Sequence, residues 1–171
     1  PAQTMTGCPT AARHCVNDAL LADLIGWASR LSGLPAAPSG ERPALQALPQ
    51  AALAQRVCGE QARDCRGLVA VYDTARREIA YADTLDLRDP TDQSYLVHEL
   101  VHYLQHRHHG ERMHLHCEAV LASEREAYAA QNRYLERFKQ WRRVGEVMRF
   151  TRCPQDQAAA EPVLRYQGAL R

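Results

Sequence analysis

The sequence predicts an α+β fold that is mostly helical, with one short β-hairpin. Several segments place apolar residues at intervals of three and four, which is the helical period, and one pair of short segments flanks a polar turn. The 171 residues are 46% hydrophobic and 24% charged, which fits one globular core. We therefore expect residues 1–171 to form a single domain, with an N-terminal helical extension (1–44), a core (45–144) and a C-terminal tail (145–171).

The first third of the chain contains two predicted helices. Residues 16–31 carry apolar side chains at helical spacing, and Ser32-Gly33 is a typical helix end. Residues 34–43 contain three prolines and are expected to form an exposed connection. A short second helix is expected at about residues 49–57.

The middle of the chain predicts a hairpin followed by helices. Residues 67–72 are rich in β-branched side chains, and residues 78–82 alternate between polar and apolar. Proline and capping residues then precede a predicted helix over 91–106. A His-rich loop over 106–116 should end that helix, a long helix should follow over about 115–144, and the tail after Cys153 is weakly patterned.

The six cysteines favour disulfides in an oxidising compartment. Their number is even, and no two have the C-x-x-C spacing of a zinc ribbon or a redox pair. We expect the pairs Cys8–Cys15, Cys58–Cys65 and Cys117–Cys153, out of the 15 connectivities that six cysteines allow. The chain starts Pro-Ala-Gln-Thr, so we expect a secreted or periplasmic protein whose signal segment has been removed.

Charge and apolar content argue against two classes of partner. The formal net charge is +1, and acidic and basic residues are interleaved along the chain. The sequence therefore contains no stripe of basic residues that could bind nucleic acid. The apolar runs are far shorter than the roughly 18 residues that a membrane-spanning helix needs. We therefore expect neither a nucleic-acid partner nor a membrane span, and the sequence predicts no oligomeric state.

The motif that carries chemistry is His98-Glu99-Leu-Val-His102, an H-E-x-x-H sequence within the helix predicted over 91–106. Two histidines four residues apart project from one face of a helix, about 6 Å apart along its axis, which suits one tetrahedral Zn²⁺ ion. In metalloproteases with this motif, the glutamate takes a proton from the attacking water. We therefore expect His98 and His102 to bind zinc and Glu99 to act as general base.

A catalytic zinc site needs a third protein ligand, and two candidates compete. Glu124 follows His102 by 22 residues, which allows a loop and an antiparallel return past the metal. His108 has the spacing of the H-E-x-x-H-x-x-G-x-x-H pattern, but Gln105 replaces the glycine on which that pattern's turn depends. Glu126 lies roughly 200° around the helix from Glu124, so both cannot face the metal. Helix geometry favours Glu124.

Two further side-chain groups are assigned more weakly. Tyr128 lies one turn after Glu124 and could donate a hydrogen bond to a developing oxyanion, although tyrosines in such positions more often serve packing. His106, His109, His114 and His116 are expected to form a solvated loop, with an auxiliary metal or pH-sensing role as the alternative.

Several segments of the chain together look like a known family: Val69–Asp73, Glu78–Ala82, Ser94–Gln105, Cys117 and Glu124–Tyr134. They resemble a family of small bacterial zincin-like proteins, with the glutamate arrangement of gluzincins. The resemblance covers about residues 45–140. It implies a small α+β zincin lobe, in which an edge strand of the short sheet could pair with an extended substrate, packed on the H-E-x-x-H helix and a glutamate helix.

The sequence thus predicts a zinc-dependent hydrolase of the metallopeptidase type, acting on a protein or peptide substrate. Its site would contain Zn²⁺ on His98, His102 and Glu124, with Glu99 and Tyr128 as catalytic residues. Two alternatives stay open. One is a zinc-stabilised binding or interaction module without turnover, acting on an envelope partner, and the other is a disulfide-stapled scaffold that binds no metal.

Overall fold

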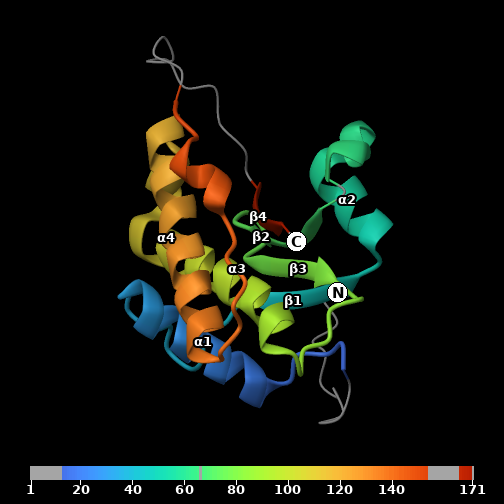
Figure 1. Ribbon diagram of the computed structural model, residues 1–171, viewed down its shortest axis with the longest axis vertical. Helices are drawn as coiled ribbons and strands as arrows, with labels where there is room; N and C mark the ends of the chain where they lie inside the picture. The colour runs from blue at the N-terminus through green and yellow to red at the C-terminus, as the bar shows by residue number, and fades with distance from the viewer. Residues whose placement is uncertain (1–12, 66, 154–165, 171) are drawn as a thin grey trace.

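The computed structural model describes residues 13–65, 67–153 and 166–170, and its α+β architecture confirms the predicted fold class (Figure 1). Helices written η are 3₁₀ helices. In chain order the elements are α1 (Asp18–Ser32), β1 (Ala44–Leu48), α2 (Gln50–Cys58), η1 (Gly59–Cys65), β2 (Leu68–Asp73), β3 (Glu78–Ala82), α3 (Pro90–His109), η2 (Gly110–His114), α4 (Cys117–Arg137), η3 (Glu146–Arg149) and β4 (Tyr166–Leu170).

The described strands form one mixed sheet in the order β1-β3-β2-β4. The predicted hairpin of β2 and β3 lies at its centre, in an antiparallel register that pairs Asp73 with Glu78. β1 pairs with β3 in parallel, and β4 pairs with β2 in antiparallel. Both outer edges of the hairpin are therefore already paired, and the free edges of the sheet belong to β1 and β4.

The two outer strands are absent from the sequence-based prediction for a physical reason. β1 has the sequence Ala-Leu-Gln-Ala-Leu, which lacks the β-branched and aromatic residues that favour strands. Its pairing with β3 is a long-range contact that no local pattern reveals. β4 lies in the weakly patterned tail, and it too is specified by its partner, β2.

The helices stack in layers on the sheet. α3 packs on β2, β3 and β4, and α1 and α4 pack on α3. Figure 1 shows α3 lying between the sheet and α4. The main apolar core fills the space between these layers and includes Leu24, Ile79, Leu96 and Leu100, all of them buried. α3 is the central element, so most of its side chains are inaccessible to solvent.

The ends of α3 follow capping rules. Asp89 accepts a hydrogen bond from the Thr91 amide at 2.8 Å, and Pro90 occupies the first turn. The helix continues to His109, past the predicted end at His106, because the first residue that interrupts it is Gly110 with φ +59°. The expected His-rich loop is therefore partly helical.

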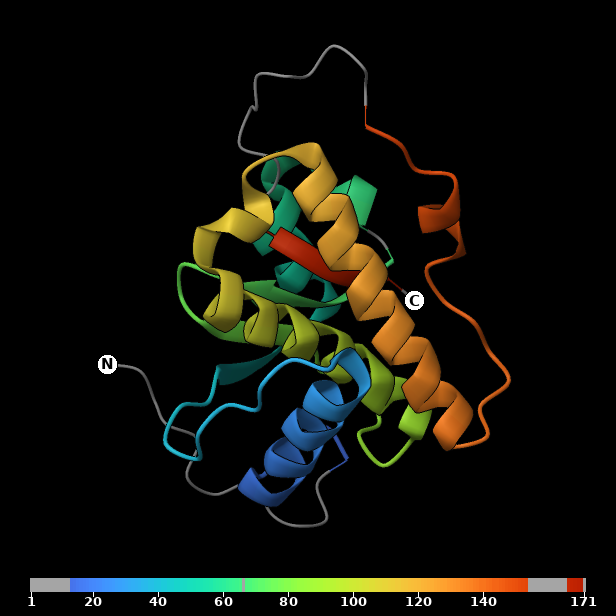
Figure 2. The same ribbon diagram turned by 90° about the vertical axis from the view of Figure 1, so that its left-hand side faces the viewer.

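α4 ends at Arg137, seven residues before the predicted end. Lys139 adopts a left-handed conformation with φ +57°, and the Gln140 amide donates to the Leu135 carbonyl at 2.8 Å, which closes the helix. Glycine usually takes this position, so a lysine here gave no sequence signal that the helix ends. Residues 138–153, named the strap below, then run back along the outside of α4 (Figure 2).

Two of the expected disulfides are present, Cys58–Cys65 and Cys117–Cys153. The expected pair Cys8–Cys15 lies outside the described residues because Cys8 does. Among the helices that the structure describes, none has the length and apolar character required to span a membrane.

Candidate metal centre

The side chains of His98, His102 and Glu124 meet between α3 and α4, with ligand atoms all within 4.8 Å of one another. The two imidazole Nε2 atoms are 3.0 Å apart. Oε2 of Glu124 lies 3.4 Å from Nε2 of His98, and Oε1 lies 3.4 Å from Nε2 of His102. Both histidines are fully buried, and Glu124 is nearly so. Four-residue spacing on α3 stacks the two imidazoles, and the antiparallel return of α4 brings the carboxylate to them.

Gln105 fixes the orientation of His102. The Gln105 amide nitrogen donates to the Ser123 carbonyl at 3.0 Å and to the Glu126 carboxylate at 2.6 Å, and both of these groups can only accept. Its amide oxygen must therefore face Nδ1 of His102, 2.8 Å away. Nδ1 consequently carries the proton, and the Nε2 lone pair of His102 points at Glu124 and His98.

Gln131 from α4 does the same for His98. The Ser94 hydroxyl donates to the Thr91 carbonyl at 2.6 Å, so its oxygen is left to accept from the Gln131 amide nitrogen at 3.1 Å. The Gln131 amide oxygen then faces Nδ1 of His98 at 3.1 Å. In its neutral form His98 is thus held in the same tautomer as neutral His102, with the proton on Nδ1 and the lone pair on Nε2.

This arrangement suits a metal ion. Two Nε2 lone pairs and one carboxylate converge on a single buried point, where the three acceptors would repel one another without a cation between them. Bonds of about 2.0–2.2 Å in a tetrahedral zinc site place ligand atoms about 3.3–3.6 Å apart, close to the separations of 3.0–3.4 Å found here. The glutamines supply the outer hydrogen bonds that ligating histidines usually have. The residues present therefore fit a bound metal.

The electrostatics keep the carboxylate charged. Burial opposes ionisation of Glu124, but the positive charge that His102 and His98 carry when protonated outweighs it and holds the pKa of the Glu124 carboxyl well below its usual range. Burial also lowers the pKa of His98. For His102, burial acts in the same direction, but the nearby Glu124 carboxylate outweighs it and raises the pKa.

Glu99 and Tyr128, the two predicted catalytic residues, both adjoin this group. Glu99 is fully buried on α3 beside His98, and its carboxylate acts electrostatically on His102. The ring of Tyr128 meets that of His98 edge-on, with centroids 4.4 Å apart. Burial, together with the carboxylates of Glu124 and Glu99, raises the pKa of Tyr128 above its usual value, so its hydroxyl remains a proton donor.

The competing ligand candidates lie elsewhere. His108 is exposed in the last turn of α3 and packs against His109, with ring centroids 4.7 Å apart. Glu126 points away from the metal group and accepts from Gln105. The structure therefore brings Glu124, and neither of these two, to the histidine pair.

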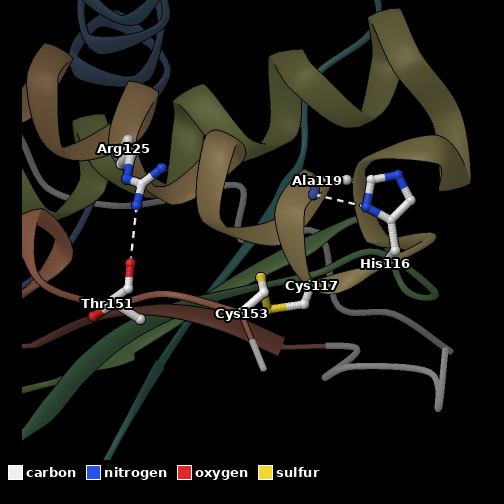
Figure 3. Close-up of a disulfide and its surroundings, with 6 residues drawn as sticks. All are labelled: His116, Cys117, Ala119, Arg125, Thr151 and Cys153. Atoms are coloured by element: carbon white, nitrogen blue, oxygen red, sulfur yellow. Dashed lines mark hydrogen bonds between the residues drawn. A yellow bond between two sulfur atoms is a disulfide. The ribbon is translucent and has the colours of Figure 1, made fainter. Parts of the chain in front are cut away.

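The expected solvated loop is only partly confirmed, because His109 and His116 are exposed whereas His106 and His114 are half-buried, and three of these four histidines lie in helices. His106 is hydrogen-bonded to the Tyr72 hydroxyl at 2.9 Å and approaches Glu111 at 3.3 Å. His116 caps α4, and its Nδ1 accepts from the Ala119 amide at 3.2 Å (Figure 3). Both side chains have structural contacts that their sequence neighbourhood did not reveal.

Sequence reasoning missed the glutamines. Gln105 lies three residues after His102, a spacing that places both on one helix face, so it could have been found. Gln131 follows Glu124 by seven residues, two turns along the same face of α4. Glutamine is common on helices for other reasons, and this makes the signal weak.

The model of a domain of unknown function, DUF6647, matches residues 13–156. The chain belongs to this family. The DUF6647 match runs from before α1 to beyond the strap and includes every residue of the metal group. No curated protein and no solved structure is significantly similar to the chain.

Proposed function

We propose that this DUF6647 protein is a zinc-dependent hydrolase of the metallopeptidase type. The observation that carries the proposal is the convergence of His98, His102 and Glu124 on one buried point, with Glu99 on the same turn of α3. Two imidazoles and one carboxylate are the protein ligands of many catalytic zinc sites. When bound at such a site, zinc acts as a Lewis acid on a carbonyl group and lowers the pKa of water.

In this proposal the chain's own residues position and move protons. Gln105 and Gln131 hold the two imidazoles with Nε2 directed at the metal position. The Glu99 carboxylate takes a proton from the water that adds to the peptide carbonyl and delivers it to the departing amine. Tyr128, whose hydroxyl keeps its proton, would donate a hydrogen bond to the oxygen that gains charge.

The disulfides support an oxidising location for this activity. Cys58–Cys65 and Cys117–Cys153 would be reduced in a typical bacterial cytosol. A secreted or periplasmic protein therefore suits this chain, and its substrate would be a protein or peptide met in that compartment.

The test separates metal binding from turnover. Glu99→Gln keeps the shape of the side chain but removes the base, so we expect unchanged zinc content by elemental analysis. We expect cleavage of a peptide library, followed by mass spectrometry, to fall by about 10²–10⁴-fold. Glu118→Gln, an exposed site in the first turn of α4, is the matched control. Full cleavage by Glu99→Gln would contradict the mechanism.

One observation favours a second candidate, a zinc-stabilised binding module without turnover. His98, Glu99 and His102 are all fully buried, and Tyr128 is nearly buried, so the metal position has little access to solvent. Such a module would lose thermal stability sharply when a chelator removes zinc, yet wild-type protein loaded with zinc would cleave no peptide of the library.

A further inference from the structure

The strap exposes an unusual amount of apolar surface. Trp141 is 93% exposed, Phe150 is 81% exposed and Val147 is 63% exposed. In the described part of the chain only two other large apolar side chains are classed as exposed, Leu115 and Phe138, and Phe138 also belongs to the strap. Isolated exposed apolar residues are ordinary, but a concentration of them within 16 residues indicates an interaction surface.

These side chains project from a segment that is fastened to α4. At one end, the Cys117–Cys153 disulfide joins the strap to the start of α4 (Figure 3). In the middle, the Asn132 side chain donates to the Val144 carbonyl and accepts from the Val144 amide, both at 3.0 Å. Arg125 donates to the Thr151 carbonyl at 3.0 Å. The strap is therefore held in place although most of it lacks regular structure.

Its inner side is apolar as well, which explains why the outer residues stay outside. Val144 and Met148 pack against Tyr128 and Leu135 of α4. Gly145, with φ +71°, lies against the ring of Tyr128, where a Cβ atom would overlap that ring. Val144, Gly145 and Met148 thus cover the apolar side chains of α4. Trp141, Val147 and Phe150 stay exposed to solvent.

The strap also concentrates positive charge. It carries five of the 21 Lys and Arg residues and one of the 20 Asp and Glu residues, so its formal charge is +4 while the other 155 residues sum to −3. The expectation that acids and bases interleave throughout the chain fails here. Lys139, Arg142 and Arg152 are exposed, and no ion pair among the described residues neutralises them.

We propose that the strap is a peripheral membrane-binding surface that docks on anionic phospholipid headgroups, with Trp141, Val147 and Phe150 entering the interfacial layer. Tryptophan and phenylalanine favour the boundary between headgroups and acyl chains, and neighbouring Arg and Lys side chains bind the anionic headgroups. The strap combines both features on one outward-facing segment, and no membrane-spanning helix is needed.

The apolar residues favour a bilayer over a soluble polyanion. Single-stranded nucleic acid binds through aromatic rings that stack on bases, but Val147 offers no such ring. An acidic protein surface would match the charges but would need a separate apolar pocket for each of Trp141, Val147 and Phe150. A lipid interface accommodates the cations and all three apolar side chains together. Docking would place α4 next to the bilayer, with Tyr128 and the metal group directly behind the strap.

The experiment is co-sedimentation of the full chain with vesicles of equal parts phosphatidylglycerol and phosphatidylcholine, compared with phosphatidylcholine alone. We expect binding to the anionic vesicles only, and weaker binding in about 0.5 M NaCl because salt screens the attraction. Arg142→Glu with Arg143→Glu should weaken binding by more than about tenfold, since each basic residue near the surface is worth about fivefold. Trp141→Ala with Phe150→Ala should also weaken it about tenfold or more.

Tryptophan fluorescence gives a second readout. The only other tryptophan, Trp27, packs against Tyr134 of α4 and against Phe138 at the start of the strap, with ring centroids 5.8 and 5.6 Å apart, so the Trp141→Phe variant is needed to separate its emission from that of Trp141. Anionic vesicles should shift the emission of Trp141 to shorter wavelength. Trp141→Phe should keep most of the binding and lose the shift.

Matched charge reversal at Arg76→Glu with Arg77→Glu, exposed on the β2–β3 turn, controls for net charge. That variant should bind nearly as well as wild type. Equal binding to neutral and anionic vesicles, or an equal loss in this control, would overturn the proposal. Stronger binding to a single-stranded oligonucleotide than to anionic vesicles at the same salt would overturn it too. None of these measurements depends on zinc or on hydrolysis.

Discussion

The face of α4 that meets α3 and the face that meets the strap differ in what their polar side chains contact. On the inner face, Glu124 and Gln131 contact other side chains, the two histidines of α3. On the outer face, Arg125 and Asn132 contact backbone groups of the strap. The inner face therefore depends on residue types in its partner, whereas the outer face binds backbone groups of the strap and depends on few of its side chains beyond Val144, Met148 and Cys153 and the absence of one at Gly145. The strap is thus free to carry exposed charged and aromatic side chains.

The largest effect should come from removing the inner carboxylate. Glu124→Ala deletes one of three metal ligands, and we expect zinc affinity to fall by about 10³-fold or more. His108→Ala should leave zinc content unchanged because His108 lies in the exposed last turn of α3. Elemental analysis of protein purified without chelators or a His-tag checks both. Zinc lost in His108→Ala and kept in Glu124→Ala would exchange the two assignments.

A substitution at Gly145 should disrupt the packing of the strap on the outer face of α4. Gly145→Ala forces a Cβ atom into the ring of Tyr128 at a backbone conformation that alanine adopts poorly. We expect the free energy of unfolding to fall by about 2–4 kcal/mol, measured by urea denaturation. Gly40→Ala is the matched control, since its Cβ would meet open space and its φ is ordinary. Equal stability of the two variants would show that the strap does not rest on Tyr128 in this way.

A smaller effect should distinguish neighbouring residues on α4. Gln131→Leu removes the acceptor for Nδ1 of His98, and we expect zinc affinity to fall by about 10–100-fold. Gln105→Leu should do the same through His102. Asn132→Ala removes the two hydrogen bonds that hold Val144 of the strap but does not touch the metal group, so it should lower stability and leave zinc affinity unchanged. Competition with a chromophoric chelator measures all three, and an equal loss of affinity in Asn132→Ala would mean that the two faces are coupled.

The sequence predicted the inner face better than the outer one for a physical reason. His98, Glu99 and His102 have a fixed spacing on a helix whose apolar period is clear, so both the helix and its chemistry could be predicted locally. Glu124 could be preferred to His108 because Gln105 cannot easily form the turn that the alternative requires. The structure supports the geometry of that choice, and zinc binding itself stays a prediction.

The strap and the outer strands could not be predicted in this way. The end of α4 depends on a left-handed Lys139, a position where glycine would have given the signal. β1 consists of alanine, leucine and glutamine, so only its pairing with β3 makes it a strand. Gln105 and Gln131 are recognised as supporting residues only when their partners are known. In each case a contact between distant segments decides the structure.

The Cys117–Cys153 disulfide has a further consequence, for chain entropy. Asp73 of β2 pairs with Tyr166 of β4, so 93 residues of chain separate these partners. The disulfide bypasses 36 of those residues. Because the entropy cost of closing a loop grows with the logarithm of its length, the shorter path favours pairing of β4 with β2 by about 0.4 kcal/mol. A reducing environment would therefore free the Cys153 end of the strap and, at the same time, make the last strand of the sheet harder to add.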